Sequence, residues 1–276
     1  MGYSGNPQTG LTDPGAISVA VVAFLVLSLY NAIELDVILL TVFQRRRGLY
    51  FWSFVASTNG IVPHSIGFFL KNILSSRQFG LYITFVAVGW VPMVTGQSLV
   101  LYSRLHLLFW DTFYLKLVLG LIIFNAIALH IPIIILMYGA NSSPSNAFVQ
   151  PYTVYEKVQV TVFFLQELII SSIYIKACFS FFDTQDSMYG DSVRKMRRHL
   201  LLVNILVVIL DVPILCLEYT DVYDLQTAYK AFVYSVKLKM EFQILNKLVE
   251  MTRAREDVDP FNNSSAIRMR DESSQR

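Results

Sequence analysis

The chain has 276 residues, of which 54% are hydrophobic and 15% are charged, and its formal net charge is +2. Soluble domains carry about 25% charged residues, and the mean hydropathy here is +0.50, so the composition excludes an ordinary water-soluble domain. The small net charge says little about partners, and we expect no nucleic acid among them.

Seven apolar stretches follow one another along nearly the whole chain. They cover residues 17–43, 49–70, 79–102, 112–137, 155–181, 200–217 and 225–248. About 20 helical residues cover roughly 30 Å of hydrocarbon, so apolar runs of this length are typical of membrane spans. Segments such as 16–29 are apolar on nearly every side, which favours helices over the alternating strands of a barrel. The sequence predicts an all-α fold, a seven-transmembrane helix bundle over residues 16–248.

Both ends of the chain are polar. Residues 1–15 contain no Lys or Arg and therefore lack the basic region of a signal peptide. We expect an extracellular N-terminal segment, followed by a first span that stays as a signal-anchor. Residues 249–276 are expected to form a cytosolic, largely disordered tail, helical for a turn or two until Pro260 ends the helix.

Basic residues alternate between the loops. The first, third and fifth loops and the tail carry most of them, and the opposite segments carry few apart from Lys71 and Arg77. Because Lys and Arg mark the cytoplasmic side, the N-terminus is predicted outside and the C-terminus in the cytosol, in either the plasma membrane or an endomembrane. Alternatively, Arg104 is simply a positive charge at the membrane–water interface. An acidic cytosolic signalling protein or anionic lipid would contact Arg45, Arg46, Arg47, Arg104, Arg194, Lys195, Arg197 and Arg198.

The outer loops offer one modification candidate and no disulfide. Asn141 begins an N-x-S sequon in the fourth loop, so it is a glycosylation candidate, although an unused sequon is an equal alternative. Cys178 and Cys216 lie near opposite faces in this topology, so we expect no disulfide between them.

Ionisable residues inside the predicted spans are the best candidates for a site, because such groups are costly in lipid and usually face the bundle interior. Lys230, Lys237 and Glu241 share one face of the seventh span. We expect Glu34 or Glu167 to neutralise Lys237, with Glu241 as an alternative partner. These groups either lock helices together or line a ligand cavity or ion path. The candidate set is Asn31, Glu34, Glu167, Asp211, Lys237 and Glu241.

The sequence carries no enzyme or cofactor signal. Spacings typical of a P-loop, a nucleophile elbow, a zinc protease or a dinucleotide-binding loop are missing, so no enzyme is expected. No Cys and His spacing predicts a metal site. Lys237 could form a Schiff base with retinal, but the third span has no carboxylate counterion, and we expect no cofactor.

Three stretches together resemble a family of fungal seven-helix integral membrane proteins without an assigned function. They are residues 43–53 (FQRRRGLYFWS), 95–106 (TGQSLVLYSRLH) and 237–246 (KLKMEFQILN). The resemblance covers about residues 16–248 and implies a fungal source and the same bundle, but no activity. The topology is also that of G-protein-coupled receptors. However, Ser103 and Leu105 replace the acidic and aromatic neighbours that those receptors have beside the arginine ending their third helix.

Three functions remain open at this stage. In the leading hypothesis the protein is a receptor-like sensor, in which a small-molecule ligand in the helix bundle shifts the cytosolic helix ends. The alternative is a small-solute or proton transporter with Glu34 and Glu167 on corresponding helices of two three-helix repeats. The third is a non-catalytic membrane scaffold, in which the ionisable residues inside the spans only hold helices together. A binding site is favoured if these residues line a cavity that solvent can reach, and a scaffold is favoured if they are paired and closed off from solvent.

Overall fold

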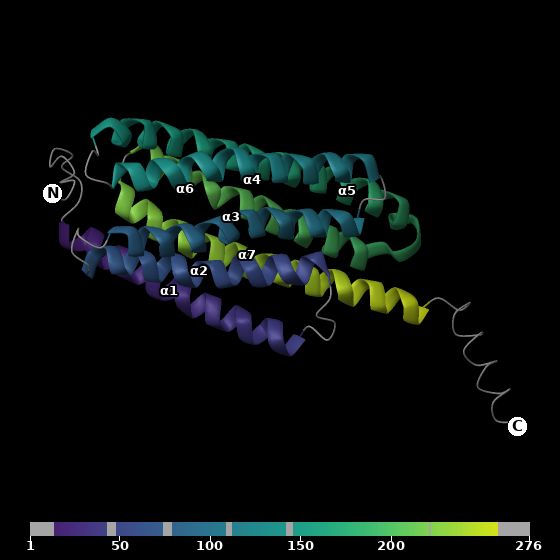
Figure 1. Cartoon of the computed structure of the whole chain (residues 1–276). Coiled ribbons are helices and arrows are strands. Elements are labelled where there is room, and N and C mark those ends of the chain that lie inside the picture. Colours follow the sequence, from purple (N-terminus) through teal and green to yellow (C-terminus); the bar gives the residue numbers. More distant parts are fainter. Residues whose placement is uncertain are drawn as a thin grey trace, which may run out of the picture.

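A computed structural model of the chain describes residues 14–42, 48–73, 79–108, 112–141, 146–220 and 222–258. The described residues form seven helices that run alongside one another, and they contain no strand (Figure 1). The helices are α1 (Pro14–Val42), α2 (Leu49–Ile73), α3 (Phe79–Leu108), α4 (Thr112–Ala140), α5 (Asn146–Ile209), α6 (Asp211–Tyr219) and α7 (Tyr223–Val258). The all-helical prediction is confirmed for this part of the chain.

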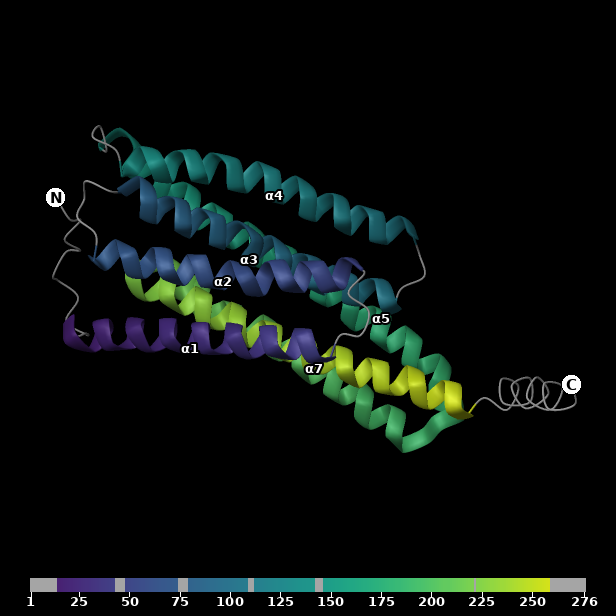
Figure 2. The ribbon, with the colours of Figure 1, turned by 60° about the horizontal axis from the view of Figure 1, so that its bottom comes forward.

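The long helix α5 turns back on itself. A straight helix would separate Ser171 from Asn204 by about 50 Å at 1.5 Å per residue. Instead, the side-chain amide of Asn204 donates to the carbonyl oxygen of Ser171 at 3.3 Å. Figures 1 and 2 show the ribbon reversing at one end of the bundle. We call residues 146–180 the outgoing arm and residues 198–209 the return arm, and they correspond to the predicted fifth span and the start of the sixth.

The return arm ends at a break that Pro213 explains. Proline has no N–H, and its ring clashes with the carbonyl four residues earlier, which here belongs to Ile209. The helix is interrupted at Leu210 and resumes as α6 at Asp211. The break therefore puts the carboxylate of Asp211 at the start of a new helix, beside α7.

Five segments are long and apolar enough to cross a membrane. They are Ile17–Val42, Gly80–His106, Thr112–Ala140, Ala147–Ser180 and Arg198–Tyr219. Large apolar side chains such as Val26 on α1 and Phe124 on α4 are exposed, and in a bilayer these surfaces face lipid rather than water. The described residues therefore form a multi-pass bundle. Helices α2 and α7 lie outside this set of five.

Helix α7 lies inside the bundle, although it is the most highly charged of the helices. It contacts α1, α2, α3, α5 and α6, and Figure 2 shows it running between α1 and α5. Its residues Ala231, Val233, Leu238 and Ile244 are buried. Because α7 is covered on most sides, its buried charged residues Lys230, Lys237 and Glu241 meet other helices. The helix continues to Val258, so the first ten residues of the predicted tail are helical.

Helices α2 and α3 approach closely enough for their backbones to touch. A methyl group added at Gly60 would lie 2.6 Å from the carbonyl oxygen of Gly89, and one added at Gly96 would lie 2.9 Å from that of Ser53. These distances are shorter than van der Waals contact, so only glycine fits. The packing of small residues along 53–60, including the hydrogen bond from Ser57 Oγ to the Met93 carbonyl at 2.9 Å, follows from this approach.

Replacing Gly89 with valine is expected to separate α2 from α3. The new side chain would meet the backbone of His64, which cannot move without shifting the whole helix, so we expect a loss of about 1–3 kcal/mol of stability. Gly120→Val on α4 is the matched control, since nothing lies within 4 Å of an added methyl group there. Thermal unfolding of the detergent-solubilised variants measures the effect. Equal unfolding temperatures for both variants would contradict this account of the packing.

Candidate functional site

The charged face of α7 forms the centre of the candidate site. Lys230, Tyr234, Lys237 and Glu241 recur at helical spacing, and all four are buried. Counted from Tyr223, this face is about 27 Å long at 1.5 Å per residue, close to the roughly 30 Å thickness of the hydrocarbon layer. Three layers of ion pairs follow one another along it, and we call them the Lys230, Lys237 and Arg104 layers.

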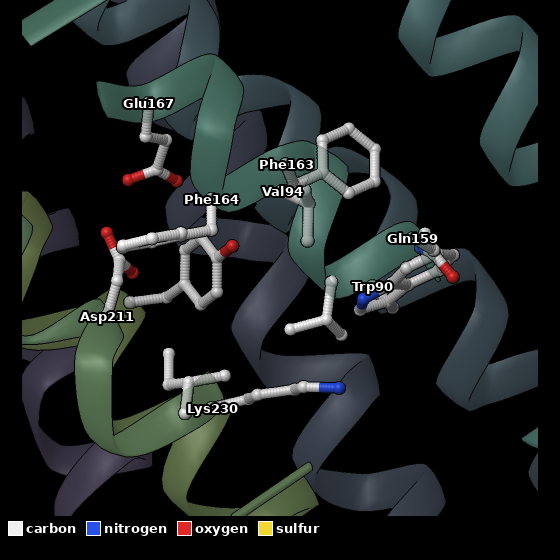
Figure 3. Close-up of a pocket in the computed structure, with 11 residues that line it drawn as sticks. Trp90, Val94, Gln159, Phe163, Phe164, Glu167, Asp211 and Lys230 are labelled. Carbon is white, nitrogen blue, oxygen red and sulfur yellow. The ribbon is translucent and has the colours of Figure 1, made fainter. Parts of the chain in front are cut away.

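The Lys237 layer lies in the middle of this face. Lys237 Nζ lies 2.6 Å from Glu167 Oε2 on the outgoing arm of α5, and it also pairs with Asp211 Oδ1 at the start of α6. The lysine is fully buried, and the two carboxylates are nearly so. Figure 3 shows the carboxylates of Glu167 and Asp211 turned toward each other. The layer therefore joins three helices through one ammonium group.

The Lys230 layer lies two turns nearer the Tyr223 end of α7. Lys230 Nζ is 3.3 Å from Glu218 Oε2 on α6 and 3.7 Å from Glu156 Oε1 on α5. Glu218 also accepts a hydrogen bond from the side-chain amide of Gln226. Asp211 and Glu218 are seven residues apart on α6, as are Lys230 and Lys237 on α7. Because α6 packs antiparallel to α7, Asp211 meets Lys237 and Glu218 meets Lys230.

The Arg104 layer lies one turn beyond Lys237 toward the other end. Arg104 Nη1 lies 2.6 Å from Glu241 Oε2, and its Nη2 donates to Asn204 Oδ1 on the return arm of α5 at 2.7 Å. The guanidinium carbon lies 4.0 Å from the ring centroid of Tyr174 on the outgoing arm. Arg104 is 1% exposed and Glu241 is 0% exposed. This layer joins α3, both arms of α5 and α7.

The three layers differ in charge balance. The Arg104 layer pairs one cation with one carboxylate, whereas each lysine contacts two carboxylates. Uncompensated charge in a low-dielectric interior is costly. Two carboxylates that share one cation therefore favour a proton on one of them. Each lysine layer therefore has one carboxylate more than it has cations.

Two small cavities lie next to the lysine layers. The first, about 30 Å³, is bordered by Glu167, Asp211 and Tyr234, and the second, about 40 Å³, by His64, Glu156 and Tyr223. Trp90, Gln159 and Lys230 border both, and Figure 3 shows these side chains beside the first cavity. Each volume suits about two or three water molecules, whereas sites for organic ligands measure about 300–1,000 Å³.

The structure separates the predicted interior residues into two groups. Glu167, Asp211, Lys237 and Glu241 lie in the Lys237 and Arg104 layers. Glu34 does not join them, because it pairs with Lys239 at 2.6 Å on a partly exposed face of α1 and α7. Asn31 donates to Ser235 at 2.9 Å between the same two helices. Of the partners considered for Lys237, only Glu167 forms an ion pair with it in the described structure, and Asp211 is a second partner that the sequence analysis did not name.

The prediction that Arg104 contacts a cytosolic partner or anionic lipid is wrong. Its side chain is 1% exposed and contacts Glu241, Asn204 and Tyr174, so it does not reach the bundle surface. Its sequence position lies at the end of a predicted span, but its burial depends on which helices pack there, and α7 supplies a carboxylate. Arg198 is exposed, as that hypothesis requires. Arg45, Arg46 and Arg47, and the side chains of Arg194, Lys195 and Arg197, lie outside the described residues.

The remaining predictions concern single residues. Asn141 is exposed, accepts from the Tyr82 hydroxyl at 2.8 Å and donates to the Met137 carbonyl at 2.8 Å, and its glycosylation stays a prediction. Cys178 is buried, Cys216 is exposed, and both are free cysteines in the structure. Among the described residues, no group of three His, Cys, Asp or Glu side chains could hold a metal ion.

Sequence reasoning missed three residues that complete the layers. Glu156 lies at the start of the predicted fifth span, Glu218 directly follows the predicted sixth span, and Asn204 lies within that sixth span. A spacing signal was available for two of them. Glu156 lies eleven residues before Glu167, and Glu218 lies seven residues after Asp211, so each acid shares a helix face with one that was predicted.

These features together define a multi-pass membrane protein whose most charged helix is enclosed by apolar helices that meet the lipid bilayer. The chain belongs to the family described as a domain of unknown function, DUF7703, whose model matches residues 12–258. The comparisons with curated proteins and with solved structures each found no match. A fungal source stays a prediction.

Proposed function

We propose that the chain crosses the membrane seven times, with α2 and α7 as inner spans. Helix α2 has 25 residues, which gives a length of about 37 Å, and it packs along α3, a span candidate. Charged residues lower the hydropathy of α7, but Lys230, Lys237 and Glu241 are buried and paired inside the bundle. Seven crossings put the two ends on opposite sides, and the distribution of basic residues among the loops supports an external N-terminus and a cytosolic C-terminus.

We propose that this protein is a non-enzymatic proton carrier. The single observation that carries the proposal is the pair of lysine layers, in which one buried ammonium contacts two carboxylates. Lys230, Glu167 and Asp211 from these layers border a water-sized cavity. A carboxylate that alternates between its charged and its protonated form at membrane depth is the usual element of a proton relay. The small cavities suit water and protons better than an organic ligand.

Proton flux into liposomes containing the purified protein tests this function. A potassium diffusion potential drives protons inward, a trapped pH-sensitive dye reports their entry, and protease access to a C-terminal tag gives the orientation of the protein. We expect flux with the unmodified protein and its loss in Asp211→Asn and in Glu167→Gln. Glu34→Gln is the matched control, because Glu34 lies in a helix of the bundle but outside the three layers, and it should keep its flux.

The receptor-like sensor is the second candidate, and the Arg104 layer favours it. One buried guanidinium ties together α3, α7 and both arms of α5, so breaking this layer would free several helix ends at once. The exposed Arg198 begins the return arm on the same side. Liposomes that show no proton flux in either orientation would overturn the carrier and leave the sensor as the better hypothesis.

A further inference from the structure

The two cavities lie on one side of the Lys237 layer. The second cavity reaches Tyr223 at the start of α7, and the first reaches Asp211 and Glu167. Both are bordered by Trp90, Gln159 and Lys230, so these three side chains lie between the cavities. From the Tyr223 end of the bundle toward its centre, the second cavity therefore comes before the first.

Unpaired polar atoms at this place indicate that the cavities hold water. No donor reaches Asp211 Oδ2, and the side-chain amide nitrogen of Gln159 has no acceptor. Asp211 is 6% exposed and Gln159 is 2% exposed, and both border the first cavity. Leaving such buried groups without a partner is unfavourable, whereas a water molecule with two to four polar partners removes that cost.

We infer that the two cavities are a water-filled half-channel that delivers protons from the Tyr223 end of the bundle to Asp211. This inference rests on the proposed carrier function and adds the proton-binding residue and the side from which it is reached. The proton moves along hydrogen-bonded water and binds Asp211 Oδ2, while Asp211 Oδ1 and Glu167 keep their contacts with Lys237. In the predicted orientation, the Tyr223 end faces the outside.

Several ionisable groups surround Asp211. Glu167 on α5 and Lys237 on α7 contact the same ion-pair layer. Tyr234 and Lys230 on α7 border the same cavity, and Tyr229 on α7 is also close enough to interact with the carboxylate electrostatically. Of these groups, Asp211 combines a bare carboxylate oxygen with a place on the cavity wall, so it is the proton acceptor in this arrangement.

Hydroxyl-radical footprinting of the protein in lipid nanodiscs tests the water path without measuring transport. Radicals form from water, so buried side chains beside internal water are oxidised and dry ones are not. Tyr234 and Tyr174 form a matched pair, since both are buried but only Tyr234 borders the described cavities. We expect oxidation of Tyr234 several-fold above that of Tyr174, and its loss in Gln159→Leu. Equal oxidation of both tyrosines would overturn the half-channel.

Infrared spectroscopy tests the proton acceptor. We expect a carbonyl band from a protonated carboxylic acid that shifts in D2O and disappears in Asp211→Asn but not in Glu34→Gln. A band that persists in Asp211→Asn would overturn the assignment to Asp211. The two proposals can fail separately. If Tyr234 is not oxidised above Tyr174 but the liposomes show proton flux, the half-channel is overturned and the carrier function stands. If Tyr234 is oxidised but there is no proton flux, the carrier function is overturned.

Discussion

Replacing Lys237 with methionine is expected to destabilise the protein more than any other single substitution considered for this chain. The change leaves Glu167 and Asp211 facing each other without a cation in a fully buried position. Removing one partner of a buried ion pair costs about 3–5 kcal/mol, and here two carboxylates lose the same partner. Thermal unfolding of the detergent-solubilised variant, followed by loss of the monodisperse peak in size-exclusion chromatography, measures the effect.

Two comparisons keep this prediction specific. Lys116→Met on α4 removes an exposed lysine and should change stability by no more than about 0.5 kcal/mol. The triple variant Lys237→Met, Glu167→Gln and Asp211→Asn removes the whole layer of charge and should recover most of the lost stability. If Lys237→Met unfolds at the same temperature as Lys116→Met, the Lys237 layer does not hold these helices together.

Replacing Arg104 with methionine is the second large effect that we expect. Glu241 then loses its cation while 0% exposed, and Asn204 loses a hydrogen bond of 2.7 Å. We expect a loss of about 3–5 kcal/mol in the same unfolding measurement. The contact with the Tyr174 ring also disappears, so the packing between α3 and the outgoing arm of α5 should loosen.

A double-mutant cycle separates the ion pair from the loss of packing. Glu241→Gln alone leaves the guanidinium unpaired, and the combined Arg104→Met, Glu241→Gln variant should be more stable than the sum of the two single effects predicts. Arg198→Met is the control for losing an exposed arginine. Strictly additive effects would show that Arg104 and Glu241 do not interact.

Much of the helical framework was predictable because lipid imposes simple rules. Long apolar runs predicted seven spans, and five of them meet the length and hydropathy that a membrane span needs. Helices α2 and α7 are harder to recognise, because their polar residues lower their hydropathy while the surrounding helices hide those residues. A sequence shows how apolar a helix is, but not which neighbours cover it.

The candidate site was predictable along each helix but not between helices. Helical spacing placed Lys237 and Glu241 on one face of α7, which the structure confirms. The pairing itself depends on how each helix is rotated about its axis. In the observed rotation, Glu34 pairs with Lys239, and Lys237 pairs with Asp211 rather than with Glu34. Arg104 is buried, although its sequence position suggested a contact with lipid headgroups.

The interior position of α7 has a consequence for biogenesis. A charged residue at the centre of a single inserting helix costs about 2.5–3.5 kcal/mol, and α7 brings Lys230, Lys237 and Glu241, so it would not partition into lipid by itself. Its acidic partners Glu167 and Asp211 are synthesised earlier, on α5 and α6. We therefore expect α7 to insert only when α5 and α6 are already in place to pair its charges.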